Sequence, residues 1–224
     1  MKPRWYVPTP HPYRPHPATW QQPLHLHLDP MWRALVPALG ALRGRVLDVG
    51  CGHKPYRAML GPGVTEYVGV DREGGDADAD LRAEADALPF DDGSFDAAVS
   101  FQVLEHVRDP AGCAREMARV LRPGGVAVVT APGVWAAHEE PHDYWRFTEH
   151  GMRALLSDAG MVDVRVTALG GFWSTLGQMA NLELNRSALG RAAIPLVNLA
   201  ARALDPRARE VLVMNWIAEA TKPR

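Results

Sequence analysis

The chain has 224 residues, of which 47% are hydrophobic, and this length can bury one full-sized core but is short for two independent enzyme domains. A formal net charge of −2 at pH 7 and a pI of about 6.5 exclude the strongly basic surface of nonspecific nucleic-acid binders, so we expect no nucleic-acid partner. With two cysteines, no secretory signal and no apolar stretch near the ~20 residues of a membrane-spanning helix, we expect a cytoplasmic protein without disulfides or integral membrane association.

Residues 1–28 are rich in proline and aromatic residues and predict an irregular N-terminal arm. Two interpretations stay open, since the arm is either loosely attached or folded across a ligand site together with its histidines, His11, His16, His25 and His27. Asp29 and Pro30 then fit an N-cap and the first residue of a helix. They predict a helix over residues 29–42, with a kink at Pro37.

From residue 45 onward, short apolar runs alternate with helical segments, which is typical of βαβ units. Helices are predicted over residues 111–121 and 149–159. We therefore predict an α/β fold, a Rossmann-like doubly wound and mostly parallel sheet with helices on both faces, formed by residues 29–169 and 209–224. The predicted strands are residues 46–49, 67–70, 97–100, 126–130, 162–168 and 211–218.

Residues 170–208 form a predicted helical insertion between the last two strands. Two functions stay open for its apolar side chains. They either cover the substrate, or they pack onto the core or onto a second copy of the chain in a homodimer.

A predicted buried strand runs into a glycine turn at Gly50, Cys51 and Gly52, where missing Cβ atoms let the backbone approach a ligand closely. The next strand ends at Asp71, whose carboxylate can accept hydrogen bonds from both hydroxyls of a ribose. This pattern also suits an NAD-linked dehydrogenase, so it does not by itself identify the nucleotide cofactor.

Residues 84–96, 104–107 and 116–125 discriminate between these cofactors. With them, the chain resembles class I S-adenosylmethionine-dependent methyltransferases of the type 11 family over about residues 44–166. The resemblance implies S-adenosylmethionine as cofactor. It also implies cofactor contacts for Asp48, Gly50, Cys51, Gly52, Asp71, Arg72, Glu84, Ala85, Phe101, Gln102 and His106.

These implied contacts follow the parts of the cofactor. Asp48 and the glycine turn would surround its methionine part, Asp71 its ribose, and Glu84 with Ala85 its adenine. Phe101 and Gln102 would lie beside the sulfonium. For Glu105 and His106, a structural role at the start of the following helix is the alternative to a cofactor contact, since a carboxylate there suits the helix dipole. Lys54 replaces a glycine of the family pattern and would face either the cofactor's carboxylate or solvent.

The acceptor side of the site is predicted in residues 131–148, which are dense in polar and aromatic side chains. Methyl transfer to oxygen requires alignment and removal of a proton. His142 beside Asp143 is the predicted catalytic base, and His138 and Tyr144 are the reserve candidates.

Residues 138–142 also match the zinc-protease pattern H-E-x-x-H, which needs both histidines on one continuous helix. Pro141 would break such a helix at a cost of about 3 kcal/mol. A non-proteolytic metal ion bound by His138, Glu139 and His142 stays an alternative, but we predict no metal site and expect ordinary loop contacts.

The predicted function is methyl transfer to a small molecule in bacterial secondary metabolism or glycan biosynthesis. Oxygen is the slightly preferred acceptor atom because of the His142 and Asp143 pair. The alternatives are an enzyme that binds the donor but catalyses a non-methylating reaction, a non-catalytic donor-binding partner subunit, and, more remotely, a dehydrogenase.

Overall fold

The computed structural model describes residues 19–74, 78–205 and 212–224, and within them seven strands form one sheet in the order β3-β2-β1-β4-β5-β7-β6. Strands β1 to β5 are parallel, whereas β7 pairs antiparallel with both β5 and β6. The predicted doubly wound, mostly parallel sheet is confirmed. The strands are Gly44–Val49 (β1), Val64–Asp71 (β2), Leu81–Arg82 (β3), Phe95–Phe101 (β4), Leu121–Pro132 (β5), Val162–Leu169 (β6) and Asn215–Thr221 (β7).

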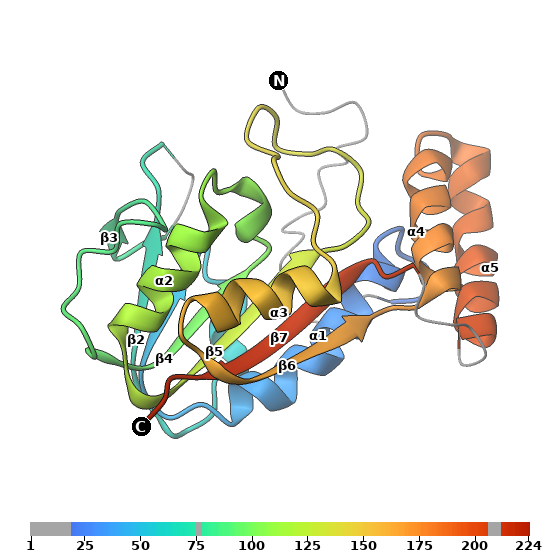
Figure 1. The fold of residues 1–224 in the computed structure, drawn as a ribbon. Coiled ribbons are helices and arrows are strands. Elements are labelled where there is room, and N and C mark those ends of the chain that lie inside the picture. Colours follow the sequence, from blue (N-terminus) through green and yellow to red (C-terminus); the bar gives the residue numbers. More distant parts are fainter. Residues whose placement is uncertain (1–18, 75–77, 206–211) are drawn as a thin grey trace.

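Helices cover both faces of the sheet, with α1 (His25–Gly40) behind it and α2 (Pro110–Val120) and α3 (Glu149–Asp158) in front (Figure 1). Alternate residues of a strand point to opposite faces. In β1, Val46 accordingly belongs to the cluster of α1, whereas Leu47 and Val49 belong to the cluster of α2 and α3. Each large apolar side chain buried in these layers contributes about 1.5–3 kcal/mol.

Two strands differ from the sequence prediction. Strand β3 was not predicted, because it consists of two exposed residues and lacks an apolar run. Strand β7 begins at Asn215, after an irregular segment at residues 212–214, and the predicted first residue, 211, lies outside the described residues.

Helix α1 begins at His25, so the predicted start at Asp29 is wrong. Leu26 is buried against Ala201 and Met214, which extends the apolar face of the helix beyond Pro30 toward the N-terminus. Asp29 is therefore inside the helix, where its carboxylate accepts a hydrogen bond from Arg33 Nε at 2.9 Å. His11 and His16 of the predicted arm lie outside the described residues.

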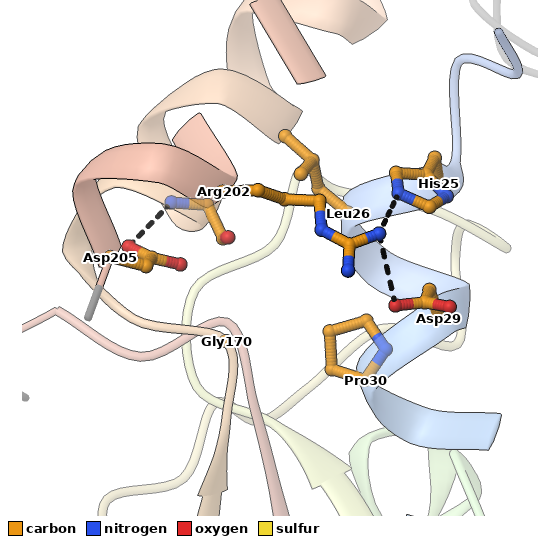
Figure 2. Close-up of a pocket in the computed structure, with 8 residues that line it drawn as sticks. His25, Leu26, Asp29, Pro30, Gly170, Arg202 and Asp205 are labelled. Atoms are coloured by element: carbon orange, nitrogen blue, oxygen red, sulfur yellow. Dashed lines mark hydrogen bonds and ion pairs between the residues drawn. The ribbon is translucent and has the colours of Figure 1, made fainter. Parts of the chain in front are cut away.

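The segment between β6 and β7 contains two helices, α4 (Phe172–Leu184) and α5 (Ala188–Leu204), which lie side by side next to the sheet (Figure 1). Arg202 of α5 contacts His25 Nε2 at 3.1 Å and Asp29 at 3.7 Å (Figure 2). Asp205 accepts hydrogen bonds from backbone N–H groups in the first turn of α4. These contacts join the helix pair to α1 around a cavity of about 350 Å³. Among the helices of the described residues, none is long and apolar enough to cross a membrane.

Candidate functional site

The glycine turn after β1 and the end of β2 meet at the edge formed by the carboxyl ends of the parallel strands. Gly50 and Gly52 have φ angles of 74° and 50°, which glycine adopts without strain. The N–H groups of Gly50 and Cys51 donate to the carbonyl of Val70, and the N–H of Gly52 donates to Asp71 Oδ2 at 2.8 Å. The structure thus brings the predicted turn and the predicted ribose carboxylate together.

The two glycines of this turn have different surroundings. A Cβ atom at Gly50 would lie 2.3 Å from Cγ2 of Val103, so this position is filled by the protein itself. A Cβ atom at Gly52 would have no heavy atom within 4 Å. Gly52 therefore borders open space.

The carboxylate of Asp71 is held in place and keeps acceptor capacity. Its Oδ1 accepts from the N–H of Arg72 at 2.8 Å and its Oδ2 from Gly52. Each carboxylate oxygen has two lone pairs, so one on each oxygen is left for a ligand hydroxyl. The backbone N–H of Arg72 thus helps to position Asp71, whereas the predicted contact of Arg72 with the cofactor stays a prediction.

Two predicted contact residues, Asp48 before the turn and Cys51 within it, have buried side chains. Asp48 is 2% exposed and accepts a hydrogen bond from the hydroxyl of Tyr67. Burial raises the pKa of Asp48 to about 7, although the Tyr67 hydrogen bond opposes this shift. Burial likewise raises the pKa of the Cys51 thiol to about 12, so this thiol is a packing group and not a nucleophile.

The remaining predicted contacts border the same edge of the sheet. Phe101 packs edge-on against Tyr56, with ring centroids 4.9 Å apart, and Gln102 donates to the hydroxyl of Thr130 at 3.2 Å. Glu84 is exposed and Ala85 packs against the core, just after β3. The ammonium of Lys54 pairs with Asp80 at 2.7 Å and its side chain is largely buried, so the solvent-facing expectation is wrong, whereas a contact with the cofactor's carboxylate stays a prediction.

The segment of residues 133–148, the olive loop in Figure 1, connects β5 to α3 and is anchored to the end of β4 and β5. The N–H of Tyr144 donates to the carbonyl of Glu105 at 2.8 Å, and Trp145 Nε1 donates to the carbonyl of Val107 at 2.9 Å. The N–H of Phe147 donates to Pro132 at the end of β5. The predicted acceptor loop is thus attached next to the ends of β4 and β5.

The expected pairing of His142 with Asp143 is wrong, because the two side chains have other partners. Asp143 binds Arg146 through two hydrogen bonds, of 2.6 and 2.8 Å, and accepts from the N–H of His138 at 2.9 Å. Burial would raise the pKa of Asp143, but the hydrogen bonds from Arg146 and His138 outweigh it and hold the pKa at about 2. His142 Nδ1 instead lies 3.0 Å from the hydroxyl of Tyr144.

A further cluster is formed by Glu105, His106 and His138, whose ligand atoms lie within 4.8 Å of one another. Glu105 and His106 belong to a short 3-10 turn, Leu104–His106, and α2 begins later with Asp109 as its N-cap, so their expected helix-opening role is wrong. Glu105 is fully buried, and burial raises its pKa to about 8. The adjacent acid and histidine were visible in the sequence, but their proximity to His138 depends on the path of the loop.

The sequence is similar to those of known methyltransferases. Residues 47–129 match the family model described as a methyltransferase domain. An uncharacterized methyltransferase of Mycolicibacterium gilvum is 36% identical over 126 residues, which are 50% of this chain and 49% of that protein. A ubiquinone biosynthesis O-methyltransferase of Xanthomonas oryzae is 41% identical over 120 residues, which are 47% of this chain and 50% of that protein. The chain spans about half the length of these curated relatives.

Among solved structures, the fold is similar to that of phosphoethanolamine N-methyltransferase 2 of Haemonchus contortus, in complex with S-adenosyl-L-methionine. The TM-score is 0.57 and the identity 18%, over 86% of this chain and 52% of that one. At this identity the likeness concerns the fold alone.

Proposed function

We propose that this chain transfers a methyl group from S-adenosylmethionine to a small molecule. The premise is that it belongs, through residues 47–129, to the type 11 family of class I S-adenosylmethionine-dependent methyltransferases. The observation that carries the proposal is the open space at Gly52 next to the Asp71 carboxylate. Ligands of doubly wound sheets bind at this edge, beyond the carboxyl ends of the strands.

The residues at this edge fit the donor. When bound, S-adenosylmethionine supplies an electrophilic methyl group on its sulfonium. Asp71 has one free lone pair on each oxygen for the ribose hydroxyls, and the bare backbone at Gly52 admits the methionine part. Glu84, exposed after β3, would accept from the adenine amino group. Asp48 supports the turn from below, through its hydrogen bond with Tyr67.

On the acceptor side, we infer that a hydroxyl is methylated and that His142 removes its proton. Tyr144 would orient the imidazole through the contact at Nδ1, which leaves Nε2 for the acceptor. His138 is less suited to this role, because its Nε2 is 4.0 Å from the buried carboxylate of Glu105. The relative named as an O-methyltransferase supports oxygen as the acceptor atom. The predicted pathways, bacterial secondary metabolism and glycan biosynthesis, stay predictions.

The helix pair α4 and α5 would cover the acceptor and carry a homodimer contact. His27 links the pair to the acceptor loop, since its N–H donates to Gln178 of α4 and its ring lies 4.4 Å from that of Trp135. Leu189, Leu196 and Leu199 of α5 are 85%, 70% and 63% exposed, and such a row of leucines suits a second copy of the chain.

The experiment that tests the function is incubation with methyl-labelled S-adenosylmethionine and a panel of hydroxylated small molecules or bacterial extract, read by mass spectrometry. Methyl transfer predicts labelled product and an equal amount of S-adenosylhomocysteine. A changed product without label would favour the non-methylating alternative, and donor binding without any turnover would favour a partner subunit. Thermal stabilisation by a nicotinamide cofactor, but not by S-adenosylmethionine, would overturn the assignment.

A further inference from the structure

The buried carboxylate of Glu105 faces two histidines from different parts of the chain. His106 Nε2 lies 3.8 Å and His138 Nε2 lies 4.0 Å from Glu105 Oε1. Neither oxygen of Glu105 has a hydrogen-bond partner among the described residues. A carboxylate removed from water without a partner is strongly unfavourable, so this arrangement favours either a proton on Glu105 or a positive species between the three side chains.

Hydrogen bonds at Nδ1 of both histidine rings show which ring nitrogen carries the proton. His106 Nδ1 lies 2.6 Å from the carbonyl of His142, and His138 Nδ1 lies 3.2 Å from the carbonyl of Ala136. Carbonyl oxygens only accept hydrogen bonds, so each Nδ1 carries its proton. In the neutral tautomers both Nε2 atoms are therefore unprotonated, and each lies within 4.0 Å of Glu105 Oε1.

This is the arrangement of metal-binding histidines in proteins, in which one ring nitrogen donates to a carbonyl or carboxylate and the other binds the metal. Asp143 adds a second such contact, since its Oδ2 is 3.5 Å from His138 Nδ1. Two imidazoles and one carboxylate are ligands for divalent ions such as Zn²⁺ or Fe²⁺, whereas Mg²⁺ and Ca²⁺ prefer oxygen ligands.

We propose that Glu105, His106 and His138 bind one divalent transition-metal ion through a carboxylate oxygen and two Nε2 atoms. Ligands held about 2.1 Å from a tetrahedral ion are roughly 3.4 Å apart, so the 3.8 and 4.0 Å separations from Glu105 need to close by about half an ångström. The ligand atoms of the two histidines, which lie within 4.8 Å of each other, need to approach by up to about 1.4 Å. His138 lies in the irregular segment 133–148 and can supply this movement. The ion would tie this segment to the turn after β4.

Three protein ligands leave a coordination position open. If the proposed methyl transfer to oxygen holds, an acceptor hydroxyl bound there would lose its proton more readily. This consequence rests on the proposed function, whereas the metal site itself does not.

The test is titration calorimetry of chelator-treated full chain with ZnCl₂, and in parallel with MgCl₂, without donor or acceptor. We expect one Zn²⁺ per chain with no comparable binding of Mg²⁺. Glu105→Gln, which keeps the side-chain shape, and His138→Ala should each weaken Zn²⁺ binding at least about tenfold. The matched control is His150→Ala, which changes an exposed histidine on α3 and should bind Zn²⁺ like the wild type.

Visible absorption of bound Co²⁺ supplies a second readout, and circular dichroism checks that each variant is folded. His138→Ala keeps the test decisive if Glu105→Gln fails to fold. Absence of Zn²⁺ binding, or equal affinity in wild type and both variants, would overturn the proposal. In the first case a proton on Glu105 compensates its burial, and in the second the ion binds elsewhere. Because methyl transfer is not measured, failure of the proposed function would not produce either result.

Discussion

Replacing Asp71 by alanine is expected to weaken the binding of S-adenosylmethionine without unfolding the protein. Two of the carboxylate's four lone pairs accept backbone N–H groups, from Gly52 and Arg72, and one on each oxygen is left for ribose. A hydrogen bond to a charged group contributes about 1.5–3 kcal/mol, and the ribose bonds exchange with water bonds, so we expect a loss within that range. This corresponds to a roughly 10- to 150-fold higher Kd.

The assay is titration calorimetry with S-adenosylmethionine or S-adenosylhomocysteine, together with two comparison variants. Asp71→Asn keeps an oxygen that can accept from Gly52 and should lose less affinity than alanine. Glu66→Ala removes an exposed carboxylate from the same strand, where it pairs with Arg45, and should leave the affinity unchanged. Unchanged affinity in Asp71→Ala, or an equal loss in Glu66→Ala, would refute the assignment of Asp71 to the ribose.

Three further predictions follow from the same edge of the sheet. Gly52→Ala should lose donor binding in calorimetry but still unfold cooperatively, with about 1 kcal/mol of strain at its positive φ. Gly50→Ala should lower the free energy of unfolding by about 1–3 kcal/mol more than Gly52→Ala does, because its Cβ atom clashes with Val103. A larger loss of stability in Gly52→Ala than in Gly50→Ala would contradict the two environments. The raised folded-state pKa of Asp48, about 7, means that the folded chain keeps a proton which the unfolded chain has released, so stability falls as pH rises from about 4 to about 7. In urea unfolding, the free energy of unfolding should fall between pH 5 and 8, and this fall should be about 1–3 kcal/mol smaller in Asp48→Asn than in the wild type. The same dependence on pH in both proteins would rule out buried Asp48 as its source. His142→Ala should lower turnover about 100- to 10,000-fold with unchanged donor affinity, and activity above a third of the His150→Ala control would make His142 a structural loop residue.

The sheet was predictable because its central strands are buried on both faces and therefore read as continuous apolar runs. Val46, Leu47 and Val49 show this for β1, with Val46 on one layer and the other two on the opposite layer. The exposed pair Leu81–Arg82 has no such run, so β3 was not visible in the sequence. The early start of α1 depends on the packing of Leu26 against Ala201, a contact far along the chain.

The candidate site, too, was predictable from the sequence only in part. Gly52 and Asp71 follow directly on predicted strands, so their meeting could be foreseen from the parallel sheet. The partners of Asp143 could not, because adjacency in sequence does not determine which way loop side chains point; here the carboxylate turns to Arg146 and His138 and away from His142. The same limitation hid the proximity of His138 to Glu105.

The most direct test of the central claim is a crystal structure of the full chain with S-adenosylhomocysteine. We predict that the ribose hydroxyls lie within hydrogen-bond distance of Asp71 and that the amino-acid part of the ligand passes beside Gly52. Ligand density at another place, such as the cavity beside Arg202 in Figure 2, with none at the glycine turn, would contradict the proposed donor site.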